Sequence, residues 1–531
     1  MPLLSKRHRC CPKCVGEGQV RSRRRRTKKQ KRELQHAKNN GLPPPPPPPP
    51  MLEPCIECSG TGILPSDHHF FSSFAGGRNL LPHVKNGTHV GICGGGIGGL
   101  ALALACQHRN IPYTVYERDQ SFNERSQGYG LTMQQGGKAL QALGLETTGQ
   151  DRLGGKGIHS KRHIVHRPDG TRVGEWGLRL WGRPDTKKED AKRQNVHISR
   201  QQLRRSIHDQ IEEKEKIEWG HKLESYSEDS EGVSMTFSKK NDDGKKCEVV
   251  QRASVLIGAD GIRSAVRQQK IGDFLSPMRY LGCIVILGIA PSPVSSDLTN
   301  DNESVFQTAD GTTRLYAMPF SKKGQESANA AGFANEEAGK GETMWQLSFP
   351  MTEEDATKLS SEGPSSLKAE ALRRCGEWHV PIPELLQVTP VELVSGYPVY
   401  DKDTLGEDSL RQGSSESGNP DSRVTMLGDA AHPMSPFKGQ GANQALLDAI
   451  LLARAIYKVY HDNDRNSSET SDNTKTNPLL TEVLTEYESS MLKRSAAKVK
   501  ASAEAAKFLH TDAAISEGNI TRGAAAKQLL D

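Results

Sequence analysis

The chain has 531 residues, a mass of 58.1 kDa and a mean hydropathy of −0.63. This length exceeds what one small core holds and predicts two or three domains. The longest nearly apolar stretch, residues 280–290, is far shorter than the roughly 20 residues of a membrane-spanning helix, which excludes an integral membrane protein. Residues 1–9 carry charge without a following apolar core, so the pattern of a secretory signal peptide is absent. We therefore expect a cytoplasmic, enzyme-sized protein.

Charge is distributed unevenly along the chain. The net charge is +6, but residues 1–50 contain 14 Lys or Arg against Glu17 and Glu33, so this head carries +12 and the remainder −6. We interpret the run from Arg21 to Arg32 as part of a disordered, solvated basic head. The alternative is a site for an anionic partner, such as nucleic acid, an anionic membrane or an import receptor, because dense positive charge attracts any polyanion. An import receptor would make the protein nuclear.

Two segments of the head share one cysteine pattern. "CPKCVGEG" at 11–18 and "CIECSGTG" at 55–62 both read CxxCxGxG, in which a tight turn lets two thiolates reach one metal. Together they predict one tetrahedral, structural zinc site. The pattern resembles the cysteine-rich repeats of DnaJ-type co-chaperones, which usually come as four rather than two, so no co-chaperone activity is implied. Unpaired or redox-active cysteines are the alternative. The expected zinc ligands are Cys11, Cys14, Cys55 and Cys58.

From His89 the chain has the pattern of a βαβ unit. A short apolar run, a glycine cluster, an Ala/Leu-rich stretch and a second apolar run follow one another up to Asp119. The glycines stand in GxGxxG register, where the first permits a sharp turn, the second lets backbone approach a pyrophosphate and the third lets the helix pack on the strand. Glu117, at the end of the second strand, is expected to accept both ribose hydroxyls of an adenosine. The glycines are Gly94, Gly96 and Gly99.

Two later segments repeat the combination of buried strand, acid and glycine turn. They are "VLIGADGIRSAVR" at 255–267 and "VTMLGDAAHPMSPFKGQGANQALLDAILLARAI" at 424–456. With the first fingerprint, and in the same order, they closely resemble the class A flavoprotein monooxygenases, the aromatic-ring hydroxylases such as para-hydroxybenzoate hydroxylase. The likeness runs from about His89 to Leu509. It implies FAD and an α/β fold, with a Rossmann-like FAD-binding domain, an interleaved β-sheet substrate domain and C-terminal helices.

The resemblance also implies cofactor-binding residues. Asp429 is expected to accept a hydrogen bond from the ribityl chain, and Asp260 with Gly261 to lie along the pyrophosphate and the path of NAD(P)H. Arg200, in "ISRQQLRRSI", matches an arginine near the flavin nucleotide; a solvent-facing helix arginine is the alternative. His432 is expected to be structural rather than a catalytic base.

The glycine-rich turn before the last long helical pattern has a physical role of its own. That pattern starts near Ala442, so the positive end of the helix dipole is expected to point at the isoalloxazine ring. Backbone N–H groups there would stabilise negative charge on the reduced flavin. These N–H groups belong to Gly441, Ala442 and Asn443.

These assignments divide the chain into interleaved domains. Alternation in "RLYAMPF" and "MWQLSFPM" indicates strands of the substrate domain, and the C-terminal helices are expected to pack back on the body or to dimerise. Five residues are candidates either for an apolar pocket or for ordinary sheet core: Tyr316, Met318, Phe320, Trp345 and Phe349. The predicted ranges are 1–86 for the basic, Pro-rich head; 87–157, 195–277 and 395–460 for the FAD-binding domain; 158–194 for a substrate-domain hairpin; 278–394 for the substrate β domain; 461–479 for a polar linker; and 480–531 for the C-terminal helices.

The reaction implied by the resemblance is sequential. NAD(P)H reduces FAD, the reduced flavin captures dioxygen as a C4a-hydroperoxide, and that species hydroxylates or epoxidises a small aromatic or polycyclic substrate. The sequence has no second GxGxxG, so NAD(P)H is expected to be a transient co-substrate. No catalytic side chain is identified, and the substrate, the choice of NADH or NADPH and the oligomeric state stay open. The alternatives are a flavin reductase of the geranylgeranyl-reductase type and a zinc-knuckle binding module with a flavin redox sensor.

Overall fold

The chain forms two compact units in a computed structural model. The N-terminal unit comprises Met1–His83 with Gln141–Gly144, and the main unit comprises Val84–Leu140 with Leu145–Asp531. Most of the predicted arginine run and all of the polyproline segment 43–50 lie outside the described residues. The structure describes residues 7–22, 32, 35–36, 39, 51–67, 89–124, 129–134, 136–145, 158–177, 195–240, 244–291, 304–321, 342–412, 421–466 and 477–528.

The N-terminal unit contains two antiparallel strand pairs. β1 (His8–Cys10) pairs with β4 (Ile63–Pro65), and β2 (Gln19–Ser22) pairs with β3 (Met51–Pro54). Each CxxCxGxG knuckle connects a strand of one pair to a strand of the other. The two pairs therefore bring the knuckles together, although they are distant in the sequence.

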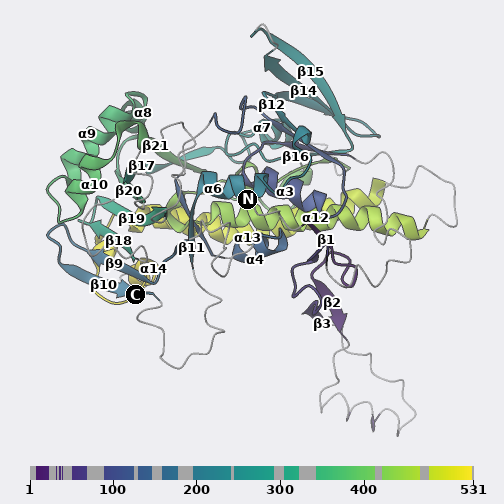
Figure 1. The fold of residues 1–531 in the computed structure, drawn as a ribbon, viewed down its shortest axis with the longest axis horizontal. Coiled ribbons are helices and arrows are strands. Elements are labelled where there is room, and N and C mark those ends of the chain that lie inside the picture. Colours follow the sequence, from purple (N-terminus) through teal and green to yellow (C-terminus); the bar gives the residue numbers. More distant parts are fainter. Residues whose placement is uncertain are drawn as a thin grey trace. The chain divides into compact units, whose positions relative to one another are not determined.

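The main unit contains a five-stranded parallel sheet (Figure 1) of the predicted Rossmann-like kind. Its order is β12-β6-β5-β16-β22, so the strand of the first glycine fingerprint lies beside the strand of the second. β5, β16 and β22 are apolar runs buried along their whole length, as expected of strands covered on both faces. Because carboxyl ends of parallel strands meet at one edge, the loops that follow them gather there. The strands are β5 (Val90–Cys93), β6 (Tyr113–Glu117), β12 (Ile217–Trp219), β16 (Val255–Gly258) and β22 (Val424–Met426).

Helices and two smaller sheets surround the parallel sheet. α3 (Ile97–Gln107) is almost fully buried and packs on α12 (Gly441–Asn466). The Ser199 hydroxyl caps the start of α6 (Arg200–His208) by accepting from the N–H of Gln202. The remaining elements are α4 (Gly136–Ala142), α7 (Ala265–Ile271) and the antiparallel sheets β7-β11-β8 (Gly130–Met133, Val196–Ser199, Ile158–His159) and β13-β14-β15 (Lys222–Glu228, Val233–Lys240, Lys246–Ala253).

A seven-stranded sheet forms the other large element of the main unit. Its order is β10-β9-β18-β19-β20-β17-β21, and neighbouring strands are antiparallel except β9 and β18. The range 158–194, predicted as a substrate-domain hairpin, includes the antiparallel pair β9 and β10. β21 extends the sheet past the predicted limit at 394 because it pairs with β17, a long-range contact that local sequence does not reveal. The strands are β9 (Arg162–His166), β10 (Arg172–Trp176), β17 (Met278–Pro291), β18 (Ser304–Ala309), β19 (Arg314–Ser321), β20 (Glu342–Pro350) and β21 (Val394–Lys402).

Helices α8, α9 and α10 cover part of this sheet (Figure 1) and close a core around Trp345 and Phe349. Phe320 is buried in a neighbouring cluster. These three pocket candidates are therefore sheet core, whereas Tyr316 and Met318 line a cavity. The helices are α8 (Glu353–Ser361), α9 (Pro364–Cys375) and α10 (Ile382–Val388).

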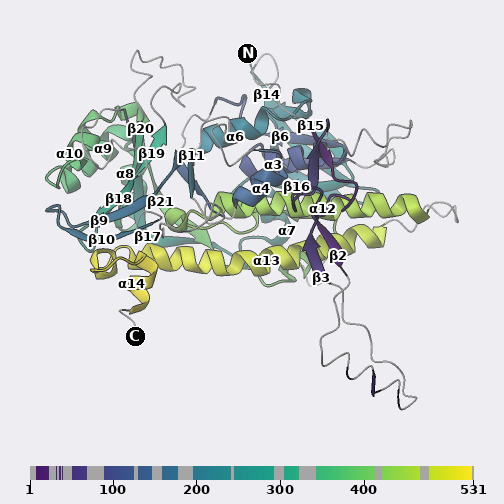
Figure 2. The same cartoon turned by 60° about the horizontal axis from the view of Figure 1, so that its bottom comes forward.

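The C-terminal helix α13 (Asn477–Phe508) lies along α12 (Figures 1 and 2). Its apolar side chains Met491, Leu492 and Val499 are buried, which favours packing on the body over dimerisation. Both helices reach into the range predicted as a linker, because adding a helical residue is cheap once a helix has formed. In the described part of the chain, no helix is long and apolar enough to span a membrane. The other short helices are α11 (Ser409–Gln412), α14 (Arg522–Gln528), η2 (Lys214–Lys216), η3 (Val391–Leu393), η4 (Gly428–Ala430), η5 (Pro436–Lys438) and η6 (Asp512–Ile515).

Candidate functional site

A cavity of about 1030 Å³ in the main unit is lined by both large sheets and their loops. We call its lining residues in the loops after β5, β16 and β22 the loop wall, and those in the strands of the seven-stranded sheet the sheet wall. Of the predicted cofactor-binding residues, Gly99 and Asn443 lie behind the lining. Those that line the cavity are Gly94, Gly96, Glu117, Arg200, Asp260, Gly261, Asp429, Gly441 and Ala442.

The first glycine loop has the close packing that its pattern predicts. Gly94 has φ +113°, and a Cβ there would lie 2.4 Å from the carbonyl oxygen of Ala259. A Cβ at Gly99 would lie 1.9 Å from the carbonyl oxygen of Gly94, which no shift of a side chain can relieve. At Gly96 a Cβ would meet no atom within 4 Å. The loop is therefore tight against the protein at two glycines and open towards the cavity at the third.

Glu117 holds this loop as well as lining the cavity. Its Oε2 accepts the N–H of Gly95 at 2.6 Å, and its Oε1 accepts the N–H of Asp119 at 3.0 Å. Arg204, which the sequence analysis did not single out, supports the same loop from α6, since its Nε donates to the carbonyl of Gly95 at 2.8 Å. Arg204 stands one helical turn after Arg200, and that i, i+4 spacing is the signal that could have identified it.

The second loop is organised by Asp260. Its Oδ2 accepts the N–H of Ala265 at 2.8 Å, at the start of α7, whereas its buried Oδ1 has no hydrogen-bond partner among the described residues. Burial raises the pKa of this carboxyl. A carboxylate oxygen left without a donor beside a cavity is suited to a hydroxyl or water of a bound nucleotide.

The third loop is anchored by a buried arginine of the second motif. Arg267 Nη1 donates to the carbonyls of Ala430 and Ala431, at 3.1 and 2.7 Å. The neighbouring Asp429 carboxylate opens on the cavity, yet the surrounding protein excludes bulk water and raises its pKa. The second and third motifs thus form one structure, which their separation in the sequence does not show.

Asp448, on α12, ties the third loop to α13. Its Oδ2 accepts the N–H of Gly428 at 2.9 Å and lies 2.7 Å from His432 Nε2, while Arg494 pairs with its other oxygen. Burial acts to lower the pKa of His432, but the attraction of Asp448 outweighs it and raises that pKa. His432 is buried and is not among the residues that line the cavity.

The start of α12 reaches the cavity through its backbone. Gly441 and Ala442 line the cavity, whereas the Asn443 side chain is buried and makes hydrogen bonds through both its oxygen and its nitrogen. Its Oδ1 accepts the N–H of Gln134 at 2.9 Å, and its Nδ2 donates to Thr132 and Gly439 carbonyls. Asn443 therefore holds the helix start against β7 and its following residue.

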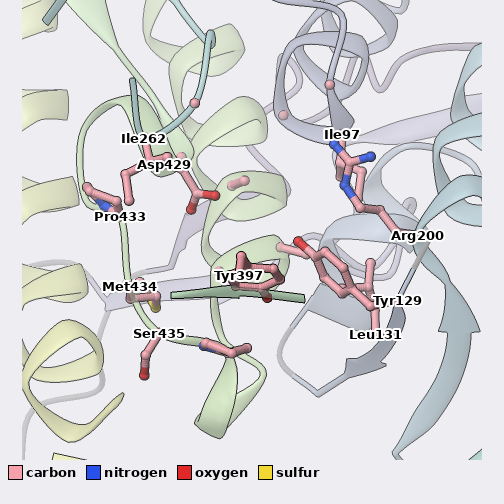
Figure 3. A pocket seen from close by; sticks show the side chains of 18 of the residues that line it. Ile97, Tyr129, Leu131, Arg200, Ile262, Tyr397, Asp429, Pro433, Met434 and Ser435 are labelled. Carbon is pink, nitrogen blue, oxygen red and sulfur yellow. The ribbon is translucent and has the colours of Figure 1, made fainter. Parts of the chain in front are cut away.

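Arg200 and Tyr129 face the third loop across the cavity. Figure 3 shows both on one side, Asp429 and Pro433 on the other, and Tyr397 between them. The N–H of Arg200 donates to the carbonyl of Tyr129 at 3.0 Å, so the two residues are held together at the start of α6. Arg200 is a cavity residue in this structure rather than a solvent-facing one.

A second candidate site lies in the N-terminal unit. The Sγ atoms of four buried cysteines lie within 4.8 Å of one another, and Cys14 Sγ is 3.7 Å from Cys58 Sγ. The N–H groups of Gly18 and Gly62 each donate to a cysteine sulfur at 3.2 Å. The cysteines are the predicted ligands Cys11, Cys14, Cys55 and Cys58.

The two knuckles have matching backbone geometry. The N–H of Cys11 donates to the carbonyl of Gly62, and the N–H of Cys55 donates to the carbonyl of Gly18, both at 2.8 Å. Gly18 and Gly62 both have positive φ, which explains why glycine stands at these places. Buried thiols that converge on one point without disulfides suit a tetrahedral zinc ion.

A sequence profile described as an FAD binding domain matches residues 87–355 and 416–485. The chain belongs to this family. FAD is therefore its cofactor, as predicted. The described walls fit this cofactor, because Gly96 leaves room for a close approach, Asp260 Oδ1 lacks a donor and Asp429 opens on the cavity. The N-terminal unit precedes the matched residues.

Similar proteins are monooxygenases by name. The chain is 28% identical over 382 residues to the aurachin C monooxygenase/isomerase of Stigmatella aurantiaca, covering 70% of this chain and 82% of that protein. It is 26% identical over 381 residues to the phenazine 1,6-dicarboxylic acid hydroxylase PhzS of Lysobacter antibioticus, covering 70% and 82%. HpxO of Klebsiella pneumoniae, solved with FAD and uric acid, shares the fold with a TM-score of 0.59 at 20% identity, covering 85% of this chain and 94% of that chain. These likenesses support an FAD-dependent monooxygenase over the reductase and the binding module.

Proposed function

We propose that the protein is an NAD(P)H-dependent FAD monooxygenase that inserts one atom of dioxygen into a small aromatic or polycyclic substrate. The observation that carries this proposal is that one cavity is lined by the nucleotide loops and by largely apolar strands of a second sheet. A cofactor held by the loop wall then has substrate-sized space beside it. The names of the relatives, among them a phenazine hydroxylase, support a polycyclic substrate.

The residues of the loop wall and of the sheet wall have different roles in this proposal. FAD held by the loop wall would supply the redox chemistry, namely hydride acceptance from NAD(P)H and electron transfer to dioxygen. Asp429 and Asp260, which line the cavity, would accept hydrogen bonds from the cofactor, and the N–H groups at the start of α12 would favour negative charge on the bound flavin. The sheet wall excludes water and orients the substrate. Its apolar and aromatic members include Leu287, Tyr316, Met318, Met344 and Tyr397.

The test is oxygen transfer by the purified full chain loaded with FAD. We expect NADH or NADPH oxidation that accelerates in the presence of a substrate from a panel of quinolones, phenazines and hydroxybenzoates, with ¹⁸O from ¹⁸O₂ in the product. Asp429→Asn is expected to lower this rate, while Cys247→Ser, on a remote strand, is a matched control. Oxidation of NAD(P)H coupled to reduction of an organic substrate, with no ¹⁸O in it, would make the protein a reductase.

A second proposal concerns the N-terminal unit, where four buried sulfurs converge. We infer that they bind one zinc ion that holds the unit together, since all four tetrahedral positions are filled by protein. Elemental analysis of the full chain should give about one zinc per chain, and Cys58→Ser should lose it while Cys247→Ser keeps it. Four thiols that titrate freely in metal-free, folded protein would contradict this proposal.

The compartment and an anionic partner of the basic head rest on the sequence alone. The density of Lys and Arg between 21 and 32 supports a polyanion as partner and import into the nucleus. A fluorescent reporter fused to residues 1–62 should then concentrate in the nucleus. An even spread through the cell would argue against import.

A further inference from the structure

Arg314 is a buried arginine of the sheet wall. It opens β19, lines the cavity and is 6% exposed. Its Nε donates to Gln307 Oε1 at 3.0 Å, and its guanidinium lies 4.9 Å from the centre of the Tyr316 ring. Both neighbours are uncharged at neutral pH, since burial raises the pKa of Tyr316 to about 12.

No carboxylate of the described residues pairs with Arg314. Burial lowers the pKa of this guanidinium to about 10, so it still carries its charge at neutral pH. Arg411 is a useful contrast, because this equally buried arginine donates from Nε and Nη2 to the two oxygens of Glu488, both at 2.7 Å. A buried charge without a counterion costs several kcal/mol, so the arrangement around Arg314 is unfavourable unless a ligand completes it.

The rest of the sheet wall is neutral. Burial lowers the pKa of His163 to about 4, which leaves that imidazole uncharged. Arg314 is then the single permanent charge among the lining residues that the described strands of this sheet contribute. Those residues are His163, Met278, Leu287, Arg314, Tyr316, Met318, Met344, Gln346, Tyr397, Pro398, Val399 and Tyr400.

The histidine beside this charge is uncharged as well. Burial and then repulsion by Arg314 lower the pKa of His510 to about 4. The guanidinium is also held in one orientation, because Gln307 Nε2 donates in turn to the carbonyl of Ala514 at 3.5 Å. A fixed planar guanidinium is preorganised for two parallel hydrogen bonds to one anionic group.

We propose that Arg314 anchors an anionic oxygen of the substrate, in a carboxylate or an ionised phenol, on a molecule that is otherwise flat and uncharged. This inference rests on the proposed function, because it takes the cavity beside the sheet wall to be the substrate site. It narrows the substrate class from aromatic compounds in general to aromatic carboxylates and phenolates. The apolar neighbours Met318 and Met344 would contact the ring system while Arg314 sets its orientation.

The experiment measures binding, so it does not depend on turnover. FAD-loaded full chain is titrated with 1-naphthoate, with the neutral isostere naphthalene-1-carboxamide and with 2-naphthol, using the flavin absorbance and the thermal midpoint as readouts. We expect naphthoate to bind about 10- to 100-fold more tightly than the carboxamide, as a charge-assisted pair of hydrogen bonds requires. Tighter binding of naphthol as the pH rises towards its own pKa would assign the anchor to phenolates as well.

Variants separate an anchor from a structural role. Arg314→Gln should reduce the naphthoate preference to about twofold or less, and Arg314→Lys should retain part of it. Arg314→Met should leave the thermal midpoint of the ligand-free protein unchanged or raise it, because an unpaired buried charge is removed. Arg374→Gln is the matched control, since Arg374 also stacks on an aromatic ring, 3.6 Å from the centre of Phe349, but pairs with Glu370.

Equal binding of the acid and the amide to the wild type, or no binding of naphthoate, overturns the inference. A fall in the thermal midpoint of Arg314→Met larger than that of Arg374→Gln also overturns it, because Arg314 would then stabilise the fold itself. If naphthoate binds as expected but no ¹⁸O reaches any substrate, the anchor stands and the proposed oxygen transfer fails.

Discussion

The loop wall and the sheet wall of the cavity are built in different ways. In the loop wall, glycines and backbone N–H groups approach one another so closely that a single methyl at Gly99 would overlap a carbonyl oxygen. In the sheet wall, side chains of regular strands line the cavity, and on β19 and β20 they do so at every second residue. A site built from backbone groups has a recognisable motif in the sequence, whereas a site built from side chains on strands has almost none. The predictions below test that contrast, from the largest expected effect to the smallest.

Gly99→Ala should abolish FAD binding. Its Cβ would lie 1.9 Å from the carbonyl oxygen of Gly94, so the loop must open, at a cost of about 3 kcal/mol. Flavin content after purification and the thermal midpoint are the measurements. Gly96→Ala is the control, since apart from its chain neighbours no atom of the described residues lies within 4 Å of its Cβ. Gly96→Ala should fold normally and lose FAD affinity only because the methyl occupies space next to the cofactor. If Gly96→Ala and Gly99→Ala were equally unstable, the difference in packing between these two positions of the loop would not matter.

Arg494→Gln should destabilise the loop wall from a distance. It leaves the fully buried Asp448 without its partner on α13, which should lower the free energy of unfolding by about 3 kcal/mol. Chemical denaturation of FAD-loaded protein measures this. Arg494→Lys should lower the free energy of unfolding by less than Arg494→Gln does. Lys493→Gln, whose exposed side chain lies 3.9 Å from Glu407, should change stability by less than about 0.5 kcal/mol.

Met318→Ala should affect the substrate and leave the cofactor alone. Met318 lines the cavity and packs against Gly130, so a shorter side chain enlarges the cavity at the sheet wall. We expect the KM of a good substrate to rise about tenfold, with a shift towards bulkier substrates. The dissociation constant of FAD should stay within about twofold of the wild type. A parallel loss of FAD would mean that the two walls are not separable.

The charge on His432 should make a small, pH-dependent contribution to the loop wall. Its pKa in the folded protein is raised above 6.5, so its stabilising effect is present below pH 6.5 and is lost as the pH rises through the folded value. The difference in unfolding free energy between wild type and His432→Gln should therefore shrink as the pH increases. Denaturation curves from pH 6 to 9 measure it, and a constant difference would mean that the imidazole stays neutral.

The sequence predicted the loop wall well for a physical reason. Its glycines and acids act through their own backbone and immediate neighbours, so Gly94 and Gly96 were expected from the spacing of the first fingerprint, while Asp260 was expected from the family resemblance. The residues that support them escaped prediction. Arg204 and Arg267 have ordinary helical surroundings in the sequence, and only the fold brings them to the carbonyls of Gly95 and Ala430.

The cysteine site follows the same rule. Each CxxCxGxG knuckle is local, so its turn and its thiol pair were predictable, and the pairing of the two knuckles was inferred from their identical pattern. The exchange of backbone hydrogen bonds between Cys11 and Gly62 became visible only when strands from distant segments were paired.

The sequence by itself determined the family and, through the family resemblance, the cofactor, because the glycine motifs that carry the resemblance depend on short-range backbone geometry. The tertiary structure decided which strand residues are core and which face the cavity: it buried Trp345 and Phe349 and left Tyr316 at the wall. It also placed Arg314 in that wall, where no carboxylate of the described residues pairs with it. Alternation along a strand shows that side chains share a face, but only the packing of sheets and helices determines what that face meets.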